Sequence, residues 1–197
     1  NQIAYEVTGG ATYKSTVQTI INDLVYHQNG AGGQLPAARI DGGLYHYGWQ
    51  HDPGEDIAQN SLLASSWMSG LVVDPMVRTY GVWENNSQIS DFIVRMGNFE
   101  KAACKWDGGQ WQGTTRYPDY TMLIDGTSDN RESATVQHVM ETGAVAAWAT
   151  YFAELRGAPD ASLRQLADDL YDSYDAEVNA ETSTSGGFAV GRSEERR

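Results

Sequence analysis

The chain has 197 residues, of which 41% are apolar and 20% charged, with 26 acidic against 13 basic side chains and a formal net charge of −13. Nucleic-acid phosphates are neutralised by clustered Lys and Arg, so this charge excludes nucleic acid as an expected partner. The same sign excludes anionic membrane surfaces.

The length suits one domain, which we expect over residues 1–181, followed by a flexible tail rich in Ser, Gly and charge over 182–197. No stretch approaches the roughly 18 continuous apolar residues of a membrane span. The chain begins at Asn1 without a basic-then-apolar signal segment, which indicates a mature form, a trimmed chain or a domain of a larger protein. Cys104 follows two alanines in an apolar helical pattern and is expected to be a buried small hydrophobe.

Apolar residues at three- and four-residue spacing predict five helices, preceded by a short strand or arm over the first nine or ten residues. Ser87 is the expected N-cap of the third helix, and Pro75 is expected to kink or split the second. The predicted helices span residues 13–29, 56–80, 87–105, 132–155 and 160–174.

The second and third helices form a unit that the fourth and fifth repeat, with residues 68–72 aligning on residues 141–145. Each unit is a helical hairpin with a tight turn on one side. Two long loops, over residues 31–55 and 106–130, lie on the other side. The short links should therefore gather at one end of the bundle and the long loops at the other, where we expect the functional site.

Several segments carry a family resemblance, namely residues 67–71, 78–80 and 89–96, the run Tyr117-Pro118-Asp119-Tyr120, and Gln137-His138 before an Ala-rich helix. Together they resemble hairpins of the α/α-toroid superfamily, which hosts glycoside hydrolases, polysaccharide lyases and sugar epimerases. The resemblance covers residues 56–176 and implies a mainly α fold of antiparallel helical hairpins. Because a complete toroid is a longer chain, we expect an incomplete or reduced toroid.

The first long loop is dense in aromatic, His and carboxylate side chains: Tyr45, His46, Tyr47, Trp49, His51, Asp52, Glu55 and Asp56. Three chemistries fit this cluster. Aromatic faces stack on sugars while paired carboxylates act as acid and base in glycoside hydrolysis. Tyr and His supply the base and acid of a uronate lyase. Acidic oxygens near His51 suit Ca²⁺, although no residue is assigned as a metal ligand.

The structural alternative is that Asp52 and Asp56 cap the following helix while the His and Tyr side chains fill the mouth of the bundle. His138 and Glu141 lie three residues apart on a predicted helix and can face one side, as a base with its partner or as an ordinary packing contact. His27, at a helix end, is expected only to interact with the helix dipole. The candidate catalytic residues are therefore Tyr45, His46, His51, Asp52 and His138.

The second long loop adds aromatic side chains and an aspartate that suit a saccharide, although the same aromatics could instead anchor the loop to the core. The candidate substrate-binding residues are Trp49, Trp111, Tyr117, Asp119 and Tyr120.

The sequence has no Walker-type phosphate loop, no dinucleotide fingerprint after a strand, no His-Glu-x-x-His zinc motif and no Gly-x-Ser-x-Gly elbow. We therefore expect a secreted or periplasmic carbohydrate-active domain that acts on a polysaccharide or oligosaccharide as a lyase or glycoside hydrolase. The alternative is a non-catalytic glycan-binding or accessory module, working beside other domains of a parent protein. A third reading is a helical scaffold for protein partners.

Overall fold

The computed structural model describes residues 2–52, 54–55, 57–83, 86–106, 116–130 and 136–185. The described chain is mainly helical, which confirms the predicted class. Its helices are α1 (Gln2–Thr8), α2 (Ala11–Gln28), α3 (Met68–Val82), α4 (Ser87–Ala103), α5 (Val136–Leu155) and α6 (Ala161–Ser185). Helix α6 continues into the segment expected as a tail, and residues 186–197 lie outside the described part of the chain.

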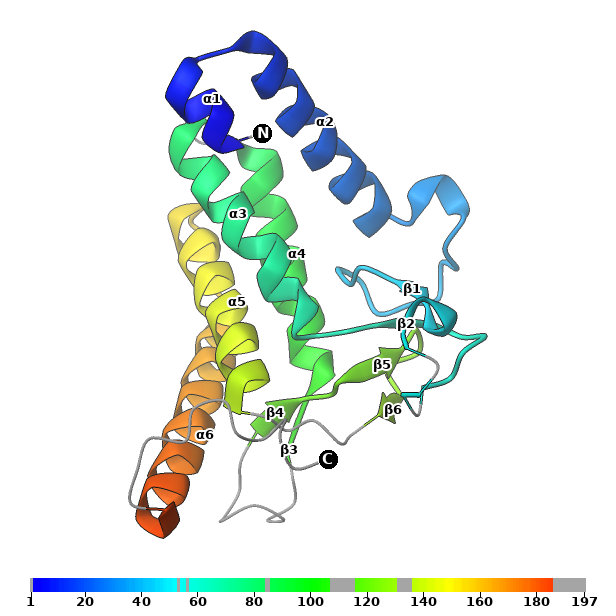
Figure 1. The fold of residues 1–197 in the computed structure, drawn as a ribbon, viewed down its shortest axis with the longest axis vertical. Helices are drawn as coiled ribbons and strands as arrows, with labels where there is room; N and C mark the ends of the chain where they lie inside the picture. The colour runs from blue at the N-terminus through cyan, green and yellow to red at the C-terminus, as the bar shows by residue number, and fades with distance from the viewer. Residues whose placement is uncertain are drawn as a thin grey trace.

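Small antiparallel sheets lie at one end of the helices (Figure 1). The larger sheet has the strand order β1 (His46–Tyr47), β2 (Leu62–Ala64), β5 (Thr121–Leu123) and β6 (Ser128–Asn130). Strands β3 (Cys104–Trp106) and β4 (Arg116–Pro118) pair separately. Two short 3₁₀ helices, η1 (Ala31–Gly33) and η2 (Gly48–Gln50), lie in the first long loop.

The links between α1 and α2, between α3 and α4, and between α5 and α6 all lie at the end of the molecule away from the sheets (Figure 1). The long segments between α2 and α3 and between α4 and α5 meet at the sheet end. This confirms the predicted orientation, in which long loops gather at one end of two helical hairpins.

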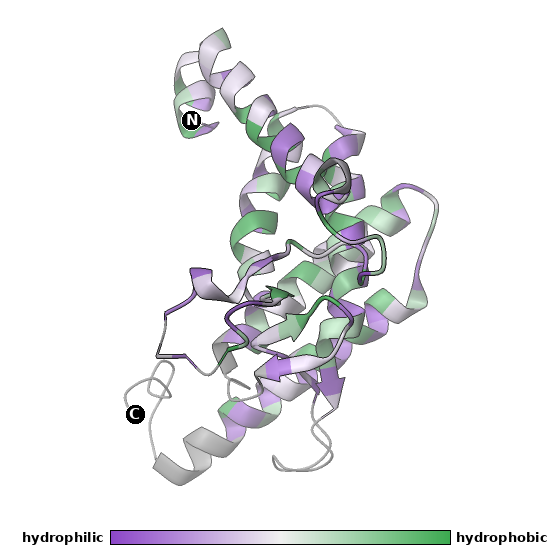
Figure 2. Cartoon of the chain, turned by 90° about the vertical axis from the view of Figure 1, so that its right-hand side faces the viewer, coloured by the Kyte–Doolittle hydropathy of each residue, from purple (hydrophilic) through white to green (hydrophobic). Residues whose placement is uncertain are grey.

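The core is built around α4, whose buried apolar residues recur at helical spacing. Figure 2 shows apolar residues of the strands and of neighbouring helices gathered in the middle of the molecule. Cys104 is buried and free, as predicted. The buried stripe of α4 is the predicted one: Ile89, Phe92, Ile93, Met96 and Phe99.

The predicted helix over residues 56–80 is wrong in its first half, because α3 begins only at Met68 and residues 62–64 form β2. Leu63 and Ala64 are both buried, so both faces of this strand are covered. A short apolar run of this kind is compatible with a buried strand or a helix, and pairing with β1 and β5 decides for the strand. Asp52 therefore does not cap this helix and instead accepts a hydrogen bond from the Gly54 N–H. Asp56, the other expected cap, lies outside the described residues.

The N-terminal segment forms helix α1 and not the expected strand or arm. Seven residues make a helix too short to be stable alone, so tertiary contacts must hold it. Glu6 pairs with Arg78, and the Tyr5 ring meets the Trp83 ring edge-on at 6.2 Å. Packing on the end of α3 therefore decides this structure.

Three smaller expectations also need correction. The N-cap of α4 is Asn86, whose side chain accepts the Gln88 N–H, and not Ser87. Pro75 lies within α3 without splitting it. The second long loop contains three short strands, β4 to β6.

Gly97 lies where α4 crosses α5. A Cβ atom at this position would lie 2.3 Å from Ala149 Cβ and 3.1 Å from Leu163 Cδ2. Because neither neighbour is the tip of a long flexible side chain, we expect Gly97→Ala to lower the free energy of unfolding by about 1–3 kcal/mol.

Urea denaturation measures this change. The matched control is Gly81→Ala in α3, where a Cβ meets nothing within 4 Å. The control should raise stability by about 0.5–1 kcal/mol, since alanine is the better helix former. An unchanged urea midpoint for Gly97→Ala would show that α4 and α5 can move apart enough to accept a methyl group without loss of stability.

Candidate functional site

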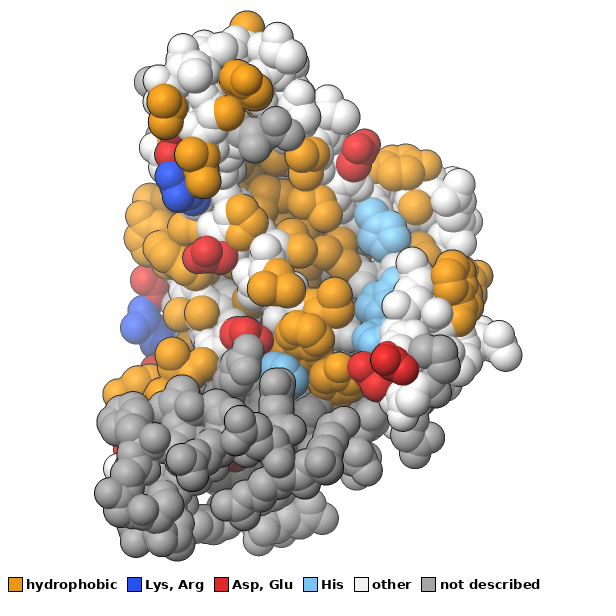
Figure 3. Space-filling model, in the orientation of Figure 1, with side chains coloured by type: hydrophobic (Ala, Val, Ile, Leu, Met, Phe, Trp, Pro, Cys, Tyr) orange, Lys and Arg blue, Asp and Glu red, His pale blue; other side chains and the backbone are white. Residues whose placement is uncertain are grey.

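A cleft of about 600 Å³ opens between the C-terminal turn of α2, the segment around β1 and η2, and the first residues of α3. Leu24 and Met68 give it apolar walls, while His27, His51 and Tyr120 bring polar atoms to its surface. Figure 3 shows histidine side chains along one wall of a hollow with an apolar floor. Both long loops contribute to this cleft, as the sequence predicted.

Strand β1 and the tight turn after it position the histidines. His46 is held by the pairing of β1 with β2. The chain then reverses through η2, where the Gly48 N–H donates to the Ser61 carbonyl and the Trp49 N–H to the Gln59 carbonyl. A Cβ on Gly48 would lie 2.4 Å from the Ala58 carbonyl oxygen, so only glycine fits this approach.

The turn brings His46 and His51 into direct contact. Their Nε2 atoms are 2.7 Å apart, and the rings stack with centroids 4.9 Å apart. On its other side, His51 Nδ1 lies 3.1 Å from Glu55 Oε2. A neutral imidazole has one donor and one acceptor nitrogen, so each ring can make both a donated and an accepted hydrogen bond here. His46 Nδ1 also lies 3.4 Å from the Leu44 carbonyl oxygen, which can only accept. Burial lowers the pKa of His46, which favours the neutral ring.

Three aromatic rings continue from this relay toward α5. The Trp67 ring stacks on His138 at 4.9 Å and on Tyr120 at 5.9 Å between centroids. The Tyr120 ring lies 6.3 Å from His51, and its hydroxyl donates to Glu55 Oε1 at 3.4 Å. An aromatic wall of Trp67, Tyr120 and His138 thus adjoins the relay of His46, His51 and Glu55.

The structure brings several predicted site residues together at this cleft. His46, His51, Asp52 and Tyr120 line it, and His138 joins through its stack on Trp67. Trp67 lies inside the predicted helix over residues 56–80 and is not among the predicted site residues; because α3 begins only at Met68, Trp67 instead lines the cleft.

Tyr45 also borders the cleft, but its contacts are structural. Its ring is buried and meets Phe99 edge-on, and its hydroxyl donates to the Ile40 carbonyl at 2.8 Å. Burial raises the pKa of Tyr45 well above its usual value, which makes proton release harder. The acid–base role proposed for Tyr45 gains no support from this geometry.

His27 does more than the expected dipole interaction. Its Nε2 lies 2.7 Å from the Tyr45 carbonyl oxygen, which ties the end of α2 to the segment before β1. His27 also lines the cleft. Its position at the entry to the first long loop was the available sequence signal.

The remaining predicted binding residues lie elsewhere. Trp49 is 61% exposed, stacks on Tyr47 and is not among the residues that line the cleft. Tyr117 is buried in a core cluster with Leu166. Asp119 is buried and accepts the Ser128 hydroxyl. Trp111 lies outside the described residues.

Within the described part of the chain, no group of three or more His, Cys, Asp or Glu side chains is placed to hold a metal ion. The suggested affinity of the acidic oxygens near His51 for Ca²⁺ gains no support here, and Asp56 of that segment is outside the described residues. Over the same described residues, no helix combines the length and apolar character needed to cross a membrane.

Comparisons of the chain with protein-family models, with curated proteins and with solved structures found no match. The class that the fold and site define is a mainly α domain of helical hairpins with a histidine- and aromatic-lined cleft at its loop end.

Glu100 on α4 is fully buried and linked to the residues on either side of Trp67. Ser66 Oγ donates to Glu100 Oε2, and the Ser69 hydroxyl adds a second hydrogen bond. The other carboxyl oxygen has no hydrogen-bond partner among the described residues. Burial raises the pKa of Glu100 to about 8, so the carboxyl is protonated at pH 7.

We expect Glu100 to make the fold less stable at alkaline pH. The pKa rises from 4.5 to about 8 on folding, so the folded state keeps a proton that the unfolded state releases. This contribution is complete below pH 4.5 and is lost as pH rises through about 8. Between these limits the free energy of unfolding should fall by up to about 1.4 kcal/mol per pH unit.

Glu100→Gln should remove this slope, because the amide does not titrate. Urea unfolding at a series of pH values measures it, with the exposed Glu154→Gln as the matched control. If Glu100→Gln keeps the parent slope, the buried carboxyl is not its source.

Proposed function

We propose that this chain is a carbohydrate-active domain that holds a saccharide in the cleft and acts on it through the relay of His46, His51 and Glu55. The observation that carries the proposal is the contact of this relay with a wall of stacked aromatic rings in one cleft. Aromatic faces bind the apolar faces of sugar rings, and a carboxylate-oriented histidine pair suits general base catalysis.

The relay can take up a proton and stabilise it. The His46 and His51 Nε2 atoms are 2.7 Å apart, and His51 Nδ1 lies 3.1 Å from Glu55 Oε2. A proton taken up along these contacts would form an imidazolium beside the Glu55 carboxylate, which stabilises it.

The charge of the cleft favours hydrolysis of an uncharged saccharide over elimination from a uronate. Among its described lining residues are the carboxylates Asp52 and Glu55 and three histidines, but no Lys or Arg. A uronate carboxylate would meet like charge here without a cationic partner. Water activated by the relay would attack the anomeric carbon, the leaving oxygen would take its proton from solvent, and the Asp52 carboxylate would accept hydrogen bonds from sugar hydroxyls.

The fold supports a reduced α/α-toroid as the proposed architecture. The hairpins α3–α4 and α5–α6 have the same direction, with short links at one end and the cleft at the other (Figure 1). In such hairpin arrays, binding sites lie on the loop side.

We expect the domain to release reducing ends from a neutral polysaccharide, and His51→Ala to lower kcat by about 10²–10⁴-fold because the relay is cut. Glu55→Gln should cause a smaller loss, since the imidazolium loses its charged partner. Glu154→Gln, an exposed carboxylate of α5, is the matched control and should keep the parent activity.

A reducing-sugar assay over neutral and uronate polysaccharides, with ultraviolet detection of unsaturated products, measures these outcomes. Unsaturated products from uronate polysaccharides would show that the reaction is elimination and not hydrolysis. Saccharide binding without turnover would make the chain an accessory module. If the chain neither binds nor cleaves any of these saccharides, the carbohydrate proposal is refuted.

Trp67→Ala should weaken saccharide binding about two- to tenfold, because one stacking face of the cleft is lost. Calorimetric titration with an oligosaccharide measures the dissociation constant. Trp106→Ala is the control, since Trp106 lies at the end of β3 beside Arg116, and not in the cleft. If the parent chain and Trp67→Ala bind the oligosaccharide with equal affinity, the aromatic wall is not part of the binding site.

A further inference from the structure

The outward side of α5 carries large apolar side chains over the full length of the helix. In a chain of net charge −13, the sequence of α5 has no charged residue from 142 to 153. Ala144 and Ala147 are also exposed. The large side chains are exposed as follows: Met140 50%, Trp148 38%, Tyr151 49% and Leu155 53%.

The inward side of α5 is also apolar. Val145, Ala149 and Phe152 are buried against the core that α4 dominates. A helix that is apolar on all sides is normally covered on all sides. Among the described residues, α3 and α6 flank α5 and nothing covers its outer face; α3 extends this face with Leu71, which is 60% exposed.

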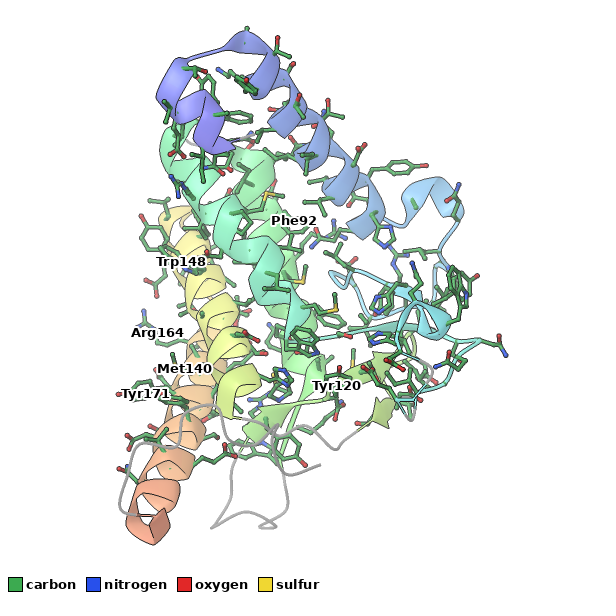
Figure 4. All side chains as sticks on the ribbon, in the orientation of Figure 1. Phe92, Tyr120, Met140, Trp148, Arg164 and Tyr171 are labelled. Carbon is green, nitrogen blue, oxygen red and sulfur yellow. The ribbon has the colours of Figure 1, made fainter. Side chains whose placement is uncertain are left out.

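Figure 4 shows Met140, Trp148 and Tyr171 on the outer edge of the helices, away from Tyr120 and the cleft. The exposed surface is therefore separate from the proposed active site. A contiguous apolar surface of this kind marks an interaction site.

We infer that this outer face of α3 and α5 joins two copies of the chain in a two-fold dimer, with the two α5 helices antiparallel. The size pattern of α5 is self-complementary about a point between Ala147 and Trp148. Antiparallel pairing there sets each Trp148 against Ala147 of the second copy and each Tyr151 against Ala144. Large side chains thus meet small ones, as close helix packing requires.

The charges on α3 fit the same axis. Helices α3 and α5 both run from the sheet end to the short-link end (Figure 1), and Gly70 packs against Glu141. The axis between Ala147 and Trp148 therefore lies level with residues 76–77 of α3. It brings Asp74 of each copy opposite Arg78 of the other, and both side chains are exposed.

This pairing is also compatible with the negative charge of the chain. Two molecules of charge −13 repel each other, so a shared interface must be uncharged or balanced. The α5 stripe is uncharged, and the pairs formed by Asp74 and Arg78 balance. A strongly acidic patch would not meet this condition.

Sedimentation equilibrium of the full chain tests the proposal. We expect a mass of twice 21.6 kDa at micromolar concentration. Trp148→Glu, which sets a charge at the centre of the interface, should give a monomer with an unchanged helical circular dichroism spectrum. Tyr26→Glu is the matched control: Tyr26 is 54% exposed on α2, and this variant should remain a dimer.

A charge swap tests the geometry. Asp74→Arg or Arg78→Asp alone should raise the dimer dissociation constant at least about tenfold, because like charges then face each other. The double variant should recover most of the affinity, although Arg78 also pairs with Glu6 within the chain.

A parent chain that is monomeric at all concentrations overturns the proposal and assigns the face to a different partner. A dimer that survives Trp148→Glu overturns it as well, because another surface then joins the copies. If the double charge variant is no tighter than the single ones, the antiparallel arrangement is wrong.

Discussion

Strand β2 carries hydrogen-bonded neighbours on both of its edges. On one side His46 pairs with Leu63, and on the other Leu63 and Ala64 pair with Leu123 and Met122 of β5. The chain then passes from β2 through two buried serines into Trp67 and α3. Because this strand connects both long loops to a helix of the core, it fixes the distance between the histidine relay and the aromatic wall.

Glu100 on α4 also holds the segment that joins β2 to α3. Its buried carboxyl accepts a hydrogen bond from Ser66, and its partner Ser69 lies in the first turn of α3. A neutral carboxyl can satisfy these hydroxyls inside the core, whereas an ionised one would be costly there. These two hydrogen bonds attach the segment around Trp67 to α4.

Sequence periodicity predicted the helices best where burial is one-sided and long. The apolar stripe of α4 has a clear three- and four-residue spacing, and its five predicted positions are all buried, although the sequence did not predict that Glu100 is buried with them. Periodicity failed at Leu62 to Ala64, because a short buried strand has the same apolar run as a helix. It also failed at α1, whose stability comes from contacts with α3.

The site was predicted in part, for a related reason. The density of His, Tyr and acidic residues pointed to the first long loop, and the hairpin repeat pointed to the loop end of the bundle. Composition could not separate His46, which faces His51, from Trp49, which points outward from the next turn. That choice is made by the reversal at Gly48, where the approach of the Ala58 carbonyl excludes a side chain.

Helix α5 connects the cleft with the outer face while keeping them apart. His138, near its first turn, is buried and stacks on Trp67, whereas Met140, two residues later, is half exposed on the outer side. Residues two apart on a helix point about 200° from each other, so the cleft and the outer face lie on opposite sides of the first turn of α5. A second copy bound to the outer face would therefore leave the cleft open to a long saccharide chain. Loss of the dimer and loss of the relay would then be independent events, although both depend on how firmly α5 is held against α4 at Gly97.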